Sequence, residues 1–91
     1  MLFALDYDET YTRDPELWDA FITLAKARGH SFICATMRHE HEGEEIKKNL
    51  GHQVEKIIFT GRKAKFDFVN NAGYYPSVWI DDMPHFLFNG G

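Results

Sequence analysis

The sequence is poor in cysteine, with Cys34 as the single thiol among 91 residues. One thiol cannot form a disulfide within the chain, which excludes a small disulfide-stapled fold. Because Cys34 lies in the apolar run Phe32–Ala35, we expect it to be buried as a small hydrophobic side chain. This cysteine usage fits a reducing compartment, and we expect a cytoplasmic protein.

Long apolar runs and an excess of positive charge are also missing. No stretch approaches the length of a membrane span, and the start of the chain lacks the basic segment of a signal peptide, so we expect no membrane partner. Ten basic residues against 14 acidic ones give a formal charge of −4, which argues against general binding to the DNA backbone. A nucleotide ligand is still compatible with this charge, because a bound metal ion can invert the local field.

What the sequence does contain is an alternation of strand and helix patterns. The hydrophobic fraction of 44% suffices for one packed domain, which we place over residues 1–91. Short apolar runs predict strands over residues 2–5, 31–35, 54–59 and 77–80, and periodic segments with start and stop signals predict helices over residues 15–28, 39–50 and 63–72. This alternation with short connections predicts a parallel sheet with helices on both faces.

Polar side chains gather where the predicted strands end, at the sheet edge where ligands bind in such folds. Two carboxylates two residues apart follow the first strand, and side chains at that spacing point to the same side. Carboxylates bind hard cations, while lysines and hydroxyls hold phosphate oxygens. In strand order the set is Asp6 and Asp8, then Thr36, then Lys63 and Lys65, then Asp81 and Asp82.

In its order this set resembles the four motifs of the haloacid dehalogenase superfamily of phosphohydrolases. The resemblance covers about residues 2–84. Asp6-x-Asp8-x-Thr10 resembles the first motif, Thr36 the second, a lysine ahead of the last strand the third, and Asp81-Asp82 the fourth.

The resemblance implies a phosphomonoester hydrolase that forms an aspartyl-phosphate. Asp6 would be the nucleophile, and Asp8 would protonate the leaving oxygen and then activate water. Thr36 would bond the phosphoryl oxygens, and Lys65 would neutralise their charge. We place Thr10, Arg62 and Lys63 beside the substrate, and Lys63 stays an alternative to Lys65 as the motif lysine.

The resemblance also implies a Mg²⁺ cofactor. The Asp6 carboxylate, the Asp8 backbone carbonyl and Asp81 would bind the ion, with Asp82 binding directly or through water. The segment His39–Glu42 is a weaker candidate for a zinc site, because residues one or two apart do not lie on one helix face. We interpret that segment as a polar helix start or a loop on the substrate side.

For the fold, we expect a Rossmann-like three-layer α/β sandwich with four parallel strands in the order 3-2-1-4. A fifth strand near Phe86–Phe88 is an open alternative. Only four residues separate Thr10 from Pro15, so no cap domain fits there, and this would be a minimal capless member. An open site would need a second copy of the chain or a large substrate to exclude water. Glu9 also departs from the family, where a small or uncharged residue is usual.

Three functions are compatible with the sequence. The first is hydrolysis of a phosphomonoester, either a nucleotide or the phosphorylated end of a polymer. The second is a catalytically degenerate domain that binds Mg²⁺ or phosphate without turnover. The third is a phospho-accepting receiver domain, which is disfavoured because its acidic pair normally lies apart from the acceptor strand.

Overall fold

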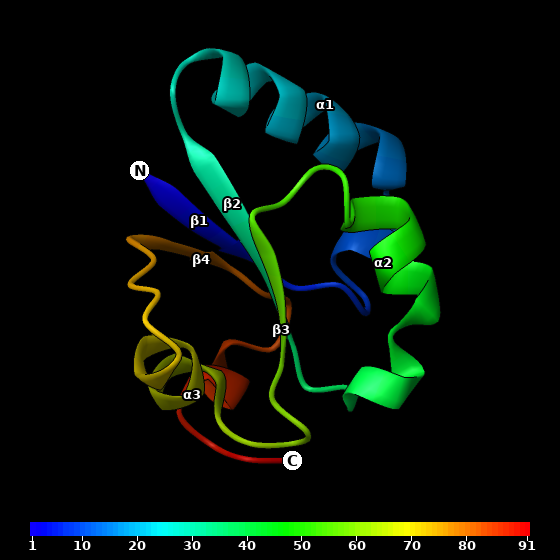
Figure 1. Ribbon diagram of the computed structural model, residues 1–91. Coiled ribbons are helices and arrows are strands. Elements are labelled where there is room, and N and C mark those ends of the chain that lie inside the picture. Colours follow the sequence, from blue (N-terminus) through cyan, green and yellow to red (C-terminus); the bar gives the residue numbers. More distant parts are fainter.

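A four-stranded sheet with β1 (Leu2–Leu5) in its interior forms the centre of the computed structural model, which describes every residue of the chain (Figure 1). The other strands are β2 (Ser31–Thr36), β3 (Lys56–Phe59) and β4 (Val78–Ile80). All pairings are parallel and the strand order is β3-β2-β1-β4, which confirms the predicted order 3-2-1-4. No fifth strand forms.

The two inner strands are apolar on both faces because helices cover both sides of the sheet. All seven residues of Phe3–Leu5 in β1 and Phe32–Ala35 in β2 are hydrophobic and buried. Leu5 pairs with Cys34 of β2 and with Ile80 of β4, so the three strands end at nearly the same height. Cys34 is fully buried, as the sequence predicts.

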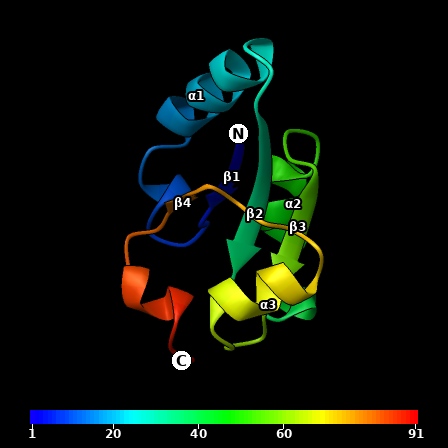
Figure 2. The ribbon, with the colours of Figure 1, turned by 90° about the vertical axis from the view of Figure 1, so that its left-hand side faces the viewer.

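Three α-helices pack on this sheet, two on one face and one on the other (Figure 2). α1 (Pro15–Ala27) begins where the Asp14 side chain accepts the Leu17 N–H at 3.2 Å, with proline in the first turn. α2 is the segment Glu44–Leu50, and α3 is the segment Lys65–Asn71.

α2 is shorter than the helix predicted over residues 39–50. Residues Glu40–Glu42 instead form a separate 3₁₀ turn, and Gly43 separates that turn from α2. A Cβ atom at Gly43 would collide with the Phe59 ring, so any other residue at this position would require that ring to move. The tertiary contact, rather than the local pattern, decides where α2 begins.

The helices divide the core into two clusters. Ile22 and Ala25 of α1 and Ile46 and Leu50 of α2 pack on one face of the sheet, and Val69 of α3 packs on the other. The sheet side chains alternate accordingly, with Phe3, Leu5, Phe32 and Cys34 on the first face and Ala4, Ile33, Ala35 and Ile58 on the second.

The C-terminal segment folds back near the sheet as a 3₁₀ turn over Pro84–Leu87. Phe86 and Leu87 are half-buried, whereas Phe88 is exposed. The Gly91 N–H donates to the Arg62 carbonyl at 2.9 Å, so the tail lies beside the β3–α3 loop. None of the helices is long and apolar enough to cross a membrane.

α1 offers a matched pair of residues for testing which face it buries. Ile22 is 1% exposed and Leu24 is 62% exposed. We expect Ile22→Ala to lower the free energy of unfolding by about 2–5 kcal/mol, because it leaves a cavity in the core. Leu24→Ala should change it by less than about 0.5 kcal/mol. Urea denaturation of both variants measures the difference, and equal losses would contradict this placement of α1.

Candidate functional site

The carboxyl ends of the strands bring most of the predicted site residues into one pocket. Asp6 directly follows β1, Thr36 ends β2, and Asp81 directly follows β4. The pocket has a volume of about 230 Å³. Its lining consists of Asp6, Asp8, Glu9, Thr36, Met37, Arg38, Arg62, Lys65, Asp81, Asp82, Met83 and Phe86.

A lysine bridges two aspartates at the base of this pocket. The Lys65 ammonium donates to Asp6 Oδ1 at 2.7 Å and to Asp81 Oδ2 at 2.6 Å. Lys65 is 2% exposed and Asp6 is 7% exposed, so these contacts are shielded from solvent. Because Lys65 is the first residue of α3, the bridge ties that helix to the ends of β1 and β4.

Burial and pairing oppose each other in setting the protonation of this bridge. Burial raises the pKa of Asp6 from its ordinary value of 3.8 to about 7, although the charge of Lys65 and its hydrogen bond pull the other way. For Lys65, burial alone would lower the pKa, but the charge of Asp6 and the hydrogen bonds with Asp6 and Asp81 raise it overall. Lys65 is therefore charged near neutral pH, while Asp6 can exchange a proton there.

Thr10 connects the first motif to the fourth. Its hydroxyl lies 2.9 Å from Asp6 Oδ2 and 3.2 Å from Asp82 Oδ1, and it accepts the Asp82 N–H at 3.1 Å. A hydroxyl carries a single hydrogen, so it can donate fully to only one of the two carboxylates. The site thus has more acceptor oxygens than donors, and a proton or a cation would satisfy the surplus.

The arrangement of carboxylates fits a divalent cation. Asp6, Asp81 and Asp82 each offer an oxygen, and these atoms all lie within 4.8 Å of one another. Three carboxylates and one ammonium carry a formal charge of −3 + 1 = −2 when all are ionised, which a divalent ion would neutralise. Oxygen ligands of this kind are the ones that Mg²⁺ prefers.

Asp8 faces a different partner from the other acids. Its carboxylate accepts two hydrogen bonds from the Arg38 guanidinium, at 2.9 Å from Nε and 2.7 Å from Nη2. The Asp8 side chain is 49% exposed, so it lies at the mouth of the pocket. Arg38 also donates to the Glu42 carbonyl at 2.7 Å and lies over the buried Tyr7 ring.

Arg38 is a site residue that the sequence analysis missed. It lies two residues beyond Thr36, and its backbone N–H donates to the Thr36 hydroxyl oxygen at 3.2 Å. The signal that could have found it is its position, since a residue two beyond a strand-end threonine lies at the same sheet edge. Only the fold shows that its guanidinium lies against Asp8, 30 residues earlier.

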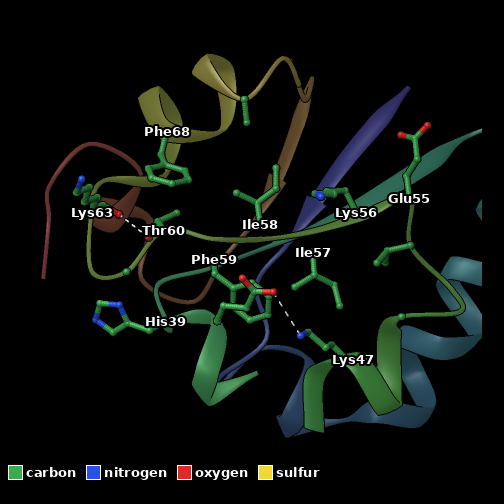
Figure 3. Close-up of a pocket in the computed structure, with 15 residues that line it drawn as sticks. His39, Lys47, Glu55, Lys56, Ile57, Ile58, Phe59, Thr60, Lys63 and Phe68 are labelled. Atoms are coloured by element: carbon green, nitrogen blue, oxygen red, sulfur yellow. Dashed lines mark hydrogen bonds and ion pairs between the residues drawn. The ribbon is translucent and has the colours of Figure 1, made fainter. Parts of the chain in front are cut away.

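The remaining predicted residues divide between two cavities. Arg62 lines the acidic pocket and donates to the Met37 carbonyl at 2.7 Å. Lys63 instead lines a larger groove of about 770 Å³ that follows the free edge of β3 (Figure 3). Lys63 is the only predicted site residue that lines this groove. The groove is therefore not the candidate active site, although it is larger than the acidic pocket.

Two residues of the acidic pocket have an unusual backbone. Glu9 has a φ of 63° and Arg62 a φ of 71°, and they are the only residues other than glycine with a positive φ. This left-handed region is costly for side chains with a Cβ, and such strain collects at functional sites. The Glu9 carboxylate pairs with the Arg13 guanidinium at 3.1 Å, and both side chains are exposed.

The raised pKa of Asp6 predicts that the free energy of unfolding of the metal-free protein depends on pH. Stability from the protonated Asp6 is fully present below pH 3.8 and is lost as the pH rises through about 7. Asparagine does not titrate, so Asp6→Asn does not lose this stability as the pH rises. The difference in unfolding free energy, variant minus unchanged protein, should therefore increase across that window by at most about 1.4 kcal/mol per pH unit. Urea denaturation in EDTA between about pH 5 and pH 7 tests this, and parallel profiles would contradict it.

The strain at Glu9 predicts a stabilising substitution. Glu9→Gly should raise the free energy of unfolding by about 0.5–1 kcal/mol, because relief of the left-handed strain exceeds the entropy cost of glycine. Glu16→Gly in the first turn of α1 is the control and should lower it by about 1 kcal/mol. Thermal melting followed by circular dichroism compares the two, and a loss at both positions would refute strain at Glu9.

Comparison with known proteins gives no further guide to this site. Neither a protein-family model, nor a curated protein, nor a solved structure matches the chain. What the pocket can do follows from its own residues, which are three clustered carboxylates, a buried lysine that bridges two of them, and a strand-end threonine.

Proposed function

We propose that the protein is a Mg²⁺-dependent phosphomonoester hydrolase of the haloacid dehalogenase type, without a cap domain. The observation that carries the proposal is the buried Lys65 ammonium, which lies between the Asp6 and Asp81 carboxylates while Asp82 lies within 4.8 Å of both. A nucleophilic carboxylate, a fixed cation and two further acids are what transfer of a phosphoryl group to an aspartate requires.

Asp6 is the nucleophile in this proposal. A carboxylate oxygen of Asp6 attacks phosphorus, the ester P–O bond breaks, and the leaving oxygen takes a proton from Asp8. Water then attacks the phosphorus of the aspartyl-phosphate and gives a proton to Asp8, the bond between phosphorus and the Asp6 oxygen breaks, and phosphate leaves. Both aspartates return to their starting protonation states.

Fixed charges lower the barrier to this transfer. Lys65 is held by two carboxylates, so its ammonium is already oriented before a phosphate arrives. Mg²⁺, held by Asp6, Asp81 and Asp82 together with the Asp8 carbonyl, would supply further positive charge to the phosphoryl oxygens. Thr36, which is buried at the base of the pocket, supplies a hydroxyl to the same group.

Arg38 acts on Asp8 rather than on the nucleophile. Its two hydrogen bonds fix the direction of the Asp8 carboxylate. For the first step Asp8 must carry a proton, so one of these bonds has to loosen as substrate enters. Arg38 is therefore a positioning residue in this mechanism.

The substrate side of the pocket is open to solvent. The four residues between Thr10 and Pro15 include a single 3₁₀ turn, Tyr11–Arg13, and no segment covers the carboxylates as a cap would. We infer that a nucleotide or a phosphorylated polymer end fits this opening, and that either a large substrate or a second copy of the chain excludes water.

The second candidate function is a domain that binds Mg²⁺ or phosphate without turnover. One observation favours it, because both Asp6 oxygens already have partners, Lys65 at Oδ1 and the Thr10 hydroxyl at Oδ2. Each hydrogen bond occupies a lone pair of its oxygen and makes that oxygen a weaker nucleophile toward phosphorus. Cation binding with no release of phosphate from any ester would support this reading.

Substitution of the nucleophile tests the proposed reaction. We expect release of phosphate from a panel of phosphomonoesters with Mg²⁺, loss of that release in EDTA, and a fall of at least about 10³-fold in kcat for Asp6→Asn. Asp67→Asn, at an exposed position in α3, should keep full activity. Circular dichroism checks that both variants fold, and turnover retained by folded Asp6→Asn would rule out the nucleophile.

A further inference from the structure

One wall of the acidic pocket is apolar. Three hydrophobic side chains, Met37, Met83 and Phe86, line a cavity whose other members are charged or polar. Met37 follows the strand-end Thr36, and the other two belong to the segment after Asp82. No step of the proposed hydrolysis uses these three residues, so their presence beside the carboxylates needs a separate reason.

Two of these side chains meet at one place although they are far apart in the chain. A Cβ atom built at Gly91 would lie 3.2 Å from Met37 Cε and 3.6 Å from Phe86 Cε1, so both side chains reach the same point. Both residues are half-buried, which leaves part of each surface facing the pocket. Together with Met83, which is 42% exposed, they are the three hydrophobic residues of the pocket lining, which we call the apolar wall.

The size of the pocket limits what the apolar wall can contact. The cavity has a volume of about 230 Å³. A cavity of roughly 150 Å³ accommodates a benzene ring in a protein core. The pocket therefore holds a phosphoryl group at its acidic end and about one ring beyond it, and the rest of a larger ligand would lie outside.

The chemistry of the wall favours a flat ring over a polar chain. Methionine sulfur and the phenylalanine ring both pack well on aromatic rings, and methionine adapts its shape to the ligand. A hydroxylated leaving group would instead lose hydrogen bonds to water against these side chains. The polar members at the mouth, Asp8 and Arg38, already hold each other.

We propose that the apolar wall binds the leaving group, and that the preferred ligands are phosphomonoesters in which a planar, apolar ring lies close to the ester oxygen. The inference rests on the proposed hydrolase function for its use in turnover, but ring binding can be measured without turnover. An aryl phosphate, with the ring directly on the ester oxygen, has this chemistry. In a nucleoside monophosphate the hydroxylated sugar takes that place, and the base would lie outside the pocket.

Binding of two phosphonates, which cannot be hydrolysed, tests the wall directly. Titration calorimetry with Mg²⁺ compares phenylphosphonate with methylphosphonate. We expect the phenyl compound to bind at least about tenfold more tightly, and Met37→Ser/Phe86→Ser to remove that preference while methylphosphonate affinity stays within about twofold. Phe88→Ser is the control, because Phe88 is 68% exposed and does not line the pocket.

Four results would overturn the ring site. The unchanged protein could bind the two phosphonates equally well, or bind neither. The double variant could keep the preference for phenylphosphonate, or Phe88→Ser could lose that preference as fully as the double variant does. Thermal melting of each variant separates loss of the wall from loss of the fold.

Turnover then separates this inference from the proposed function. Phenyl phosphate, thymidine 5′-monophosphate and acetyl phosphate are compared, and the double variant should lose about tenfold in kcat/KM for phenyl phosphate but not for the other two. An equal or larger loss for thymidine 5′-monophosphate would contradict a site for an aryl leaving group. Hydrolysis of all three with no selective loss contradicts the ring site alone, whereas ring-selective binding without any hydrolysis supports the ring site and contradicts the hydrolase.

Discussion

The buried bridge from Lys65 to Asp6 and Asp81 is the interaction on which the rest of the site depends. It joins the start of α3 to the ends of two neighbouring strands, so three separate segments are fixed by one ammonium group. Buried ion pairs of this kind contribute little net stability, because desolvation offsets most of the attraction. Removing one partner, however, leaves the other charge buried and unpaired. Such a bridge is therefore costly to build and costly to break.

The same bridge leaves the site short of positive charge. One ammonium faces three carboxylates, and the single hydroxyl hydrogen of Thr10 is shared between Asp6 and Asp82. The raised pKa of Asp6 follows from burial under these conditions, and a proton is the simplest way to relieve the excess. In the proposed reaction a divalent cation would relieve it more completely and would create a place for a phosphate dianion.

The sequence predicted the parts of this structure that follow from local rules. The parallel sheet follows from the alternation of apolar runs and helix patterns, and its strand order is what the family resemblance implies. The meeting of Asp6, Thr36, Lys65 and Asp81 at one pocket follows from the geometry of parallel sheets. Other features depend on contacts between distant segments and have no local signal. Examples are the Arg38 guanidinium against Asp8, the break at Gly43 that shortens α2, and the position of Lys63 on the β3 groove. The positive φ of Glu9 is a backbone property that no hydrophobic pattern encodes.

β4 is the shortest strand and lies at the edge of the sheet, with β1 as its only neighbour. All three of its residues are half-buried, so opening of this edge is opposed mainly by the pairing with β1 and by the bonds of Asp81 and Asp82 to Lys65 and Thr10. Asp81 and Asp82 directly follow this strand, and fraying of β4 would disperse the acidic cluster while the remainder of the sheet stays folded. Ligand occupancy and edge order are then thermodynamically linked, because anything that binds the assembled cluster also holds β4 in place. The pocket would then be formed in only a fraction of the molecules, and bound ligand would raise that fraction.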